Sequence, residues 1–111
     1  ELPFVREDRI FYSHDLFHDK TLYKKALDLL TGNVYITIDL DVLDPSIMPS
    51  TGTPEPGGPA YYELMHFLKT VAGERNVVGF DVVEMCPSPV NKAPDFVAAK
   101  IIYQLLSYVF A

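Results

Sequence analysis

The chain has 111 residues, enough for one domain with a modest hydrophobic core. Its formal charge of −6 and its nine scattered Lys and Arg residues exclude a basic surface for nucleic acid. A hydrophobic content of 49%, with seven Tyr and seven Phe, excludes disorder. We therefore expect residues 1–111 to form a single folded domain that binds no nucleic acid.

The first half of the chain predicts a strand, a helix and a second strand. Residues 9–12 (RIFY) predict a short, weakly patterned strand. Residues 19–31 place apolar side chains at helical spacing and stop at Gly32-Asn33, which is a signal for a helix C-terminus. The β-branched run Val34–Ile38 is typical of a buried parallel strand.

The second half repeats this alternation after a long loop. Residues 42–58 are rich in Pro, Gly and Ser, and Pro59 suits the first turn of a helix that ends at Gly73. Residues 77–83 predict a second apolar strand, and Pro94 opens a last helix. Strands that alternate with helices in this way predict a parallel α/β sheet.

The longest apolar stretch belongs to the last helix. It runs from Phe96 to Phe110, carries a single polar stripe of Lys100, Gln104 and Ser107, and is too short to span a bilayer. The only cysteine, Cys86, excludes an internal disulfide and fits a reducing compartment. The opening residues ELPFVREDR show no signal-peptide pattern. We expect a cytoplasmic protein with no membrane partner.

Three carboxylates follow the two predicted strands. Asp39 and Asp41 close the first strand and Glu84 closes the second, and parallel strands end at the same edge of a sheet. Residues at i and i+2 point to the same side of a strand, roughly 6.6 Å apart. Two carboxylates so close repel each other unless a cation intervenes, and oxygen ligands suit Mg²⁺ or Mn²⁺. The pattern favours a metal site, although Asp at these positions also serves helix capping and turns.

Two known uses of such acidic runs fit poorly. A calcium-binding EF-hand loop that starts at Asp39 needs Gly at its sixth position and Glu at its twelfth, where this chain has Asp44 and Ser50. A haloacid-dehalogenase-type phosphatase would use Asp39 as nucleophile and Asp41 as acid and base, but the residues that follow, Val42-Leu43, differ from its usual motif. The phosphatase stays as an alternative.

A third family fits over a longer span. Residues 39–45 (DLDVLDP) followed by 49–58 (PSTGTPEPGG) closely resemble the last metal-binding signature of the ureohydrolases, the arginase and agmatinase family. Residues 81–87 (DVVEMCP) resemble the DxxExNP segment of that family, with Cys86 where Asn is usual. The resemblance covers roughly residues 34–110 and implies the C-terminal part of a three-layer α/β/α fold with a mostly parallel sheet.

The resemblance also implies roles for individual residues. Asp39 and Asp41 would be ligands of a dinuclear manganese centre, and Glu84 would pair with the guanidinium group of a small substrate. Hydrolysis would give urea and an amine. Glu55-Pro56 resembles agmatinase-like members, so agmatine is the preferred substrate and putrescine the product. The residues that would shape the loop and orient the ligands are Asp44, Thr51 and Thr53.

The chain also departs from the family pattern. The upstream GGDHS-type and DAHxD-type segments, which supply further ligands, are absent, and His14, His18 and His66 lie in no such motif. His14 and His18 have a spacing that could bind metal on a helix, but we interpret them as an ordinary surface pair. We expect little catalysis by these residues alone, a need for the missing N-terminal part of the fold, and self-association through exposed strand edges. A truncated, non-catalytic homologue with a structural or regulatory role is the alternative.

Overall fold

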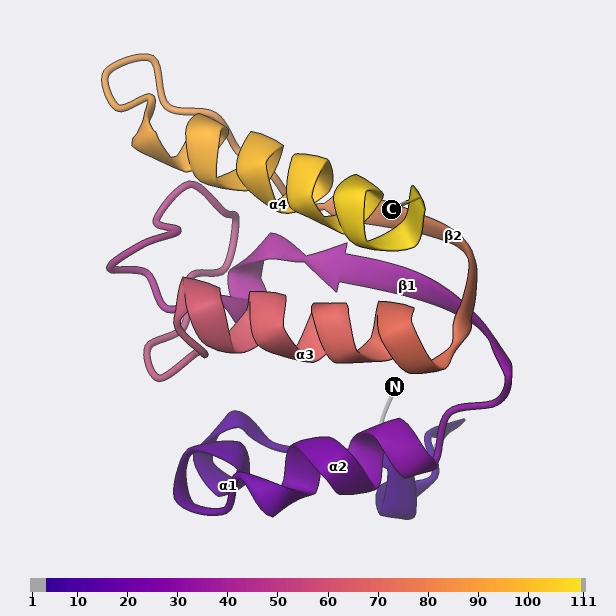
Figure 1. Cartoon of the computed structure of the whole chain (residues 1–111). Helices are drawn as coiled ribbons and strands as arrows, with labels where there is room; N and C mark the ends of the chain where they lie inside the picture. The colour runs from indigo at the N-terminus through magenta and orange to yellow at the C-terminus, as the bar shows by residue number, and fades with distance from the viewer. Residues whose placement is uncertain (1–3, 111) are drawn as a thin grey trace.

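A computed structural model describes residues 4–110. Within these residues, four helices and two strands are joined by loops and short 3₁₀ turns (Figure 1). In chain order the elements are η2 (Glu7–Arg9), α1 (Ser13–His18), α2 (Thr21–Asp28), β1 (Asn33–Asp39), η3 (Leu40–Val42), α3 (Tyr61–Glu74), β2 (Asn76–Val83) and α4 (Ala93–Phe110).

The two strands form a parallel sheet, as the alternation of elements predicted. Their register runs from Asn33 opposite Asn76 to Asp39 opposite Val83, with one irregularity after Val34. Helix α3 makes the crossover between them. Both strands therefore end at the same side of the molecule, where the long loop before α3 and the loop before α4 also lie (Figure 1).

Helices α2, α3 and α4 cover one face of this sheet. The main core joins β1 and η3 to α3 and α4, and a smaller cluster joins α2 to β1 and α3. Each large side chain buried in this way contributes roughly 1.5–3 kcal/mol. The main cluster contains Ile38, Leu40, Leu43, Met48, Met65, Leu68, Ala98, Ile101 and Leu105, and the smaller one contains Leu27, Val34 and Val71.

The opposite face of the sheet is open to solvent. The Tyr35 ring lies over Gly79, where a Cβ atom would stand 2.8 Å from the ring, and the Tyr35 hydroxyl donates to an Asp81 carboxylate oxygen at 3.1 Å. Tyr35 remains 60% exposed. The described residues thus contain one helix layer and one part of a sheet, which is the partial α/β architecture that the sequence predicted.

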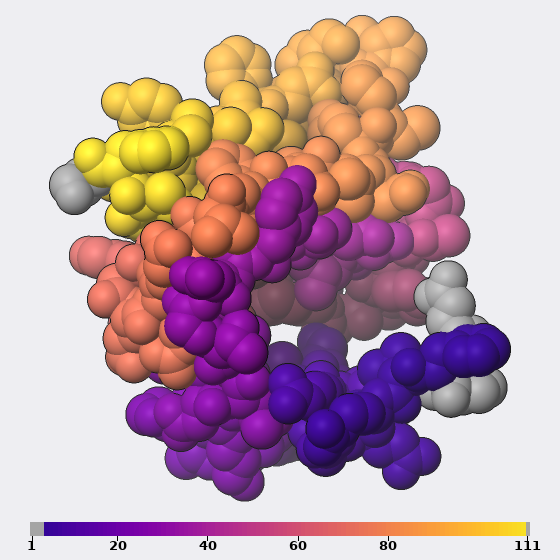
Figure 2. Space-filling model, turned by 90° about the vertical axis from the view of Figure 1, so that its right-hand side faces the viewer, coloured from indigo at the N-terminus to yellow at the C-terminus, as the bar shows by residue number. Residues whose placement is uncertain are grey.

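The strand predicted at residues 9–12 is wrong. Arg9 ends a 3₁₀ turn, and Ile10 and Tyr12 have extended backbones that pair with no strand in the described part of the chain. A groove of about 380 Å³ is lined by Phe11 on one side and by β1 on the other. Figure 2 shows a hollow between the N-terminal segment and the rest of the molecule. Four consecutive residues of β1, 34–37, line this groove, so it follows the strand edge that faces away from β2. A strand requires hydrogen bonds from a neighbouring strand, and within residues 4–110 no strand pairs with residues 9–12.

The three predicted helices are confirmed, with shifted ends. Helix α2 stops at Asp28, before the Gly32 signal, and α3 begins at Tyr61, so Pro59 precedes the helix. Helix α4 begins at Ala93, with the expected Pro94 in its first turn. The short helix α1, of six residues, is not predicted by the sequence pattern. Within residues 4–110, no helix is long and apolar enough to cross a membrane.

Candidate active site

The carboxyl edge of the sheet brings the three predicted carboxylates together. Asp39 is the last residue of β1 and lies opposite Val83, the last residue of β2, so Glu84 follows directly beside it. Asp41 lies in η3, immediately after β1. The positions of all three residues follow from the parallel pairing of the two strands.

The pKa of Asp39 is raised in this cluster. Asp39 is half-buried, and one of its carboxylate oxygens accepts a hydrogen bond from the Asp41 backbone N–H at 3.2 Å. Burial raises the pKa of Asp39, and the neighbouring charges of Asp41 and Glu84 raise it further against the lowering effect of that hydrogen bond. The two other carboxylates are therefore close enough to disfavour ionisation of Asp39.

Hydroxyl groups of the following loop support Asp41. The Thr53 hydroxyl donates to an Asp41 carboxylate oxygen at 2.6 Å. Thr51 is buried, and its hydroxyl finds no hydrogen-bond partner among residues 4–110. Among residues 4–110, the structure thus shows a hydrogen bond to the acidic cluster from the Thr53 hydroxyl and none from the Thr51 hydroxyl.

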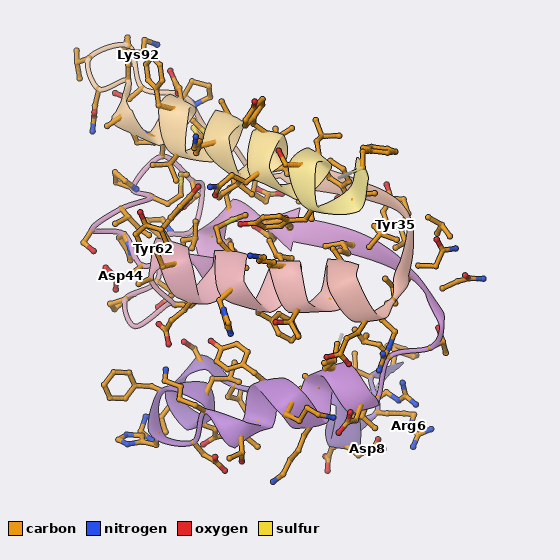
Figure 3. All side chains as sticks on the ribbon, in the orientation of Figure 1. Arg6, Asp8, Tyr35, Asp44, Tyr62 and Lys92 are labelled. Atoms are coloured by element: carbon orange, nitrogen blue, oxygen red, sulfur yellow. The ribbon has the colours of Figure 1, made fainter. Side chains whose placement is uncertain are left out.

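Asp44 holds the ends of the loop together. Its two carboxylate oxygens accept hydrogen bonds from the backbone N–H groups of Ser46 at 2.9 Å and Gly57 at 3.0 Å. The hydrogen bonds from Ser46 and Gly57 lower the pKa of Asp44. Figure 3 shows Asp44 beside this loop, at the end of the molecule where the strands finish. Asp44 therefore acts on the loop rather than on the carboxylate cluster.

An unusual backbone conformation sets the position of Glu84. The residue has a φ angle of 63°, a left-handed conformation that non-glycine residues adopt rarely. Two residues later, the backbone N–H of Cys86 donates to the Ser50 carbonyl oxygen at 2.8 Å. The loop after β2 is thereby tied to the loop after β1, and nothing in the sequence pattern signalled this link or the conformation of Glu84.

The donor set fits part of a site for a hard divalent cation. Three carboxylates gather at one edge, and the charges of Asp41 and Glu84 add to the effect of burial in raising the pKa of Asp39. Within the described residues, however, no three Asp, Glu, His or Cys side chains are arranged to hold a metal ion. Carboxylate oxygens suit Mn²⁺ or Mg²⁺, but these residues alone supply too few of them.

The histidines lie apart from this cluster. His14 and His18 are neighbours on α1, with ring centroids 4.7 Å apart, and both are exposed. His66 is exposed on α3. Since no third metal-binding side chain joins the pair on α1 in the described part of the chain, the structure gives it no metal-binding role.

Fold and site together define a parallel α/β protein with an acidic cluster at the carboxyl edge of its sheet. The chain belongs to the arginase family, because the sequence model of that family matches residues 6–107. This match confirms the ureohydrolase resemblance of the DLDVLDP and TGTP segments.

Named relatives place the chain within that family. An N(1)-aminopropylagmatine ureohydrolase from Synechocystis sp. is 33% identical over 111 residues, which cover 97% of this chain and 36% of that protein. An agmatinase from Halalkalibacterium halodurans is 43% identical over 94 residues, which cover 81% of this chain and 32% of that protein. The chain spans about a third of the length of these relatives.

A solved structure confirms the arginase-like fold. Proclavaminate amidino hydrolase from Streptomyces clavuligerus matches with a TM-score of 0.82 at 28% identity. The match covers 91% of this chain and 36% of that one. The open face of the sheet and the groove beside β1 are therefore features of a partial three-layer fold.

Proposed function

We propose that this chain is the C-terminal part of a manganese-dependent ureohydrolase that converts a guanidino compound into urea and an amine. One observation carries the proposal: Asp39, Asp41 and Glu84 converge at the carboxyl edge of the sheet in a chain of the arginase family. The shared edge gives one place where a cation and a guanidinium group can be bound side by side.

Each carboxylate has a separate task in this proposal. Asp39 and Asp41 would hold manganese, which when bound polarises a water molecule and lowers its pKa. Glu84 would accept hydrogen bonds from the planar guanidinium group, which a carboxylate binds in a bidentate manner. Thr53 would fix the rotamer of Asp41 through the hydrogen bond at 2.6 Å.

The substrate we propose is agmatine, which would give putrescine. Glu55-Pro56 resembles agmatinase-like members, and the relative from Halalkalibacterium halodurans is named an agmatinase. The name of the Synechocystis relative favours a second candidate, N(1)-aminopropylagmatine. Both compounds carry the same guanidinium group, so the proposed role of Glu84 is the same for each.

These 111 residues would not complete the site. Asp39 and Asp41 leave most coordination positions of a metal pair unfilled, so further ligands must come from the part of the fold that the relatives possess beyond this span. We propose that this N-terminal part is the first partner of the chain and that the complete enzyme is a homo-oligomer. The exposed free thiol of Cys86 fits a reducing compartment, so we place the enzyme in the cytoplasm.

The test is urea release by the protein that includes the upstream part of the fold. With manganese present, we expect urea from agmatine or N(1)-aminopropylagmatine, and we expect Asp39→Asn and Asp41→Asn each to lower kcat by roughly a hundredfold or more. Glu84→Gln should lower kcat/KM and leave bound manganese unchanged. Thr31→Ser, an exposed change far from the cluster, is the matched control.

Two outcomes would replace this proposal. A folded, complete protein that binds manganese but releases no urea from either compound would favour the non-catalytic homologue. Beryllofluoride trapped on Asp39, together with phosphatase activity, would favour the phosphatase alternative.

A further inference from the structure

A cavity opens directly beside the proposed metal ligands. It has a volume of about 300 Å³ and is lined by Asp41 and Thr53, the hydrogen-bonded pair of the candidate active site. Its other walls come from the start of α1 and from the loop between η3 and α3, and they include Val42 and Glu55. Pockets for small ligands measure roughly 300–1,000 Å³, so this cavity has room for part of a small molecule.

The charged residues that line this cavity have one sign. They are Asp41 and Glu55, and no described Lys, Arg or His joins them. The sequence gives the reason, because no Lys or Arg occurs between Lys25 and Lys69. Manganese would offset the charge of Asp41, whereas the exposed carboxylate of Glu55 stays available to a ligand. A cleft lined by a single sign of charge concentrates ions of the opposite sign, so the cavity favours a cationic group and disfavours a carboxylate.

The backbone that carries Glu55 is stiff. A proline precedes Glu55 and another follows it; each fixes its own φ angle and restricts the residue before it to extended conformations. Gly57, with a φ angle of 89°, is held from both sides, because its N–H donates to Asp44 and its carbonyl oxygen accepts from the Ser13 hydroxyl. A carboxylate on such a pre-organised loop loses little conformational freedom when it binds a ligand.

The reach from Asp41 to Glu55 is comparable to the length of the proposed substrate. Thr53 contacts Asp41, and the Cα atoms of Thr53 and Glu55, two residues apart, are separated by at most about 7 Å. Agmatine carries a guanidinium group and an amine at opposite ends of a four-carbon chain, which spans roughly 7 Å when it is extended. Val42, which is 43% exposed, gives the cavity an apolar surface for the methylene groups between them.

We infer that this cavity binds the amine end of the substrate and that Glu55 determines specificity by accepting hydrogen bonds from the ammonium group. The inference rests on the proposed function, because the guanidinium group must be bound beside Asp41 and Glu84 for the rest of the substrate to enter the cavity. It also defines the class of substrate, which is a guanidino compound with a second positive charge. A neutral group in the cavity would leave Glu55 without a partner, and a carboxylate would be repelled.

The test compares two substrates that differ only at the amine end, with the complete protein and manganese. Pentylguanidine has a methyl group where agmatine has an ammonium group. We expect Glu55→Gln to lower kcat/KM for agmatine by about tenfold, chiefly through KM, and to leave kcat/KM for pentylguanidine unchanged. Glu74→Gln is the matched control, because Glu74 is exposed at the far end of α3, away from the carboxyl edge of the sheet. Circular dichroism of each variant shows whether it has folded.

Calorimetry separates this inference from the proposed function. In an Asp39→Asn background, where hydrolysis is slow, Glu55→Gln should weaken agmatine binding by about tenfold and leave pentylguanidine binding unchanged. Urea release in which Glu55→Gln affects both substrates equally, or neither, would overturn the inference and leave the proposed function intact. Selective loss of agmatine binding in a protein that releases no urea would support the inference and overturn the proposed function. Absence of urea together with unchanged agmatine binding would overturn both.

Discussion

Glu84 occupies a backbone conformation that costs free energy. A non-glycine residue in the left-handed region is strained by roughly 1–3 kcal/mol, and such strain persists only where the surroundings impose it. Here the hydrogen bond from Cys86 to the Ser50 carbonyl holds the turn in place. Strained residues gather at functional sites, which agrees with the proposed role of the Glu84 carboxylate.

This strain gives a prediction for stability. Glu84→Gly should raise the free energy of unfolding of the chain by about 1 kcal/mol, because glycine adopts a positive φ without steric cost. Glu84→Gln is the matched control, since it removes the charge and keeps the strain. Urea denaturation followed by circular dichroism measures both. Equal stability of the two variants would show that the backbone of Glu84 is not strained.

Asp44 predicts how the chain responds to acid. The pKa of Asp44 in the folded chain lies below its unfolded value of about 3.9, because Ser46 and Gly57 donate to the carboxylate. Its stabilising contribution is therefore complete above the unfolded pKa and is lost as the pH falls through the folded pKa. Asp44→Asn should lower the Tm at neutral pH and flatten its fall below about pH 4. An unchanged acid limb in thermal melts would contradict this role.

At the scale of elements, the loop between β1 and α3 depends on one close approach. A Cβ atom on Gly58 would lie 2.2 Å from the Val42 carbonyl oxygen and 2.6 Å from the Asp44 backbone nitrogen. Both of these are backbone atoms, so they cannot turn aside as a side chain could. Only glycine lets the end of the loop pack against its beginning, next to Asp41.

Gly58→Ala should therefore destabilise the chain by about 1–3 kcal/mol, the usual range for overpacking. Gly52→Ala is the control in the same loop, because a Cβ atom there meets nothing within 4 Å. We expect this control to change the free energy of unfolding by less than about 0.5 kcal/mol. Chemical denaturation of the two variants decides the matter. Similar losses in both would mean that the loop tolerates the clash by moving.

The elements that the sequence predicted well are those whose residue pattern lies within a single segment of the chain. The β-branched residues of β1 and the apolar spacing in α3 lie within one segment each, so no distant neighbour is needed to recognise them. Residues 9–12 have a strand pattern, but a strand also needs a hydrogen-bonded neighbour. In the described part of the chain, a groove rather than a strand lies between these residues and β1. The acidic cluster was predictable because parallel strands end at one edge. The left-handed Glu84 was not, because it depends on a contact between two loops.

At the scale of the whole molecule, the chain exposes more surface than a compact protein. A monomer of 12.5 kDa is expected to expose roughly 6,200 Å², whereas this chain exposes 7383 Å². Its radius of gyration is 14.3 Å, against about 13 Å for a compact domain of this length. The excess agrees with an open sheet face, a free edge of β1 and the groove beside it.

Hydrogen exchange along β1 should show what fills this groove. In the chain alone, the backbone amides of 34–37 that face the groove lack strand partners and should exchange quickly, as should those of Ile10 and Phe11. When the chain is co-expressed with the N-terminal part of the Synechocystis relative, a strand from that part should enter the groove. It would pair with β1 and bring residues 9–12 into the same sheet, so both segments should exchange at least tenfold more slowly.

The control segment for this exchange measurement is the middle of α3. Amides in the middle of α3 are already hydrogen-bonded within their helix and buried beside Leu68, so their exchange should change less than that of the two groove segments. Uniform slowing across the chain would indicate a general gain in stability rather than a new strand. Formation of the complex with unchanged exchange at 34–37 would show that the N-terminal part binds elsewhere. In that case the strand pattern of RIFY would have no structural partner in the complete protein.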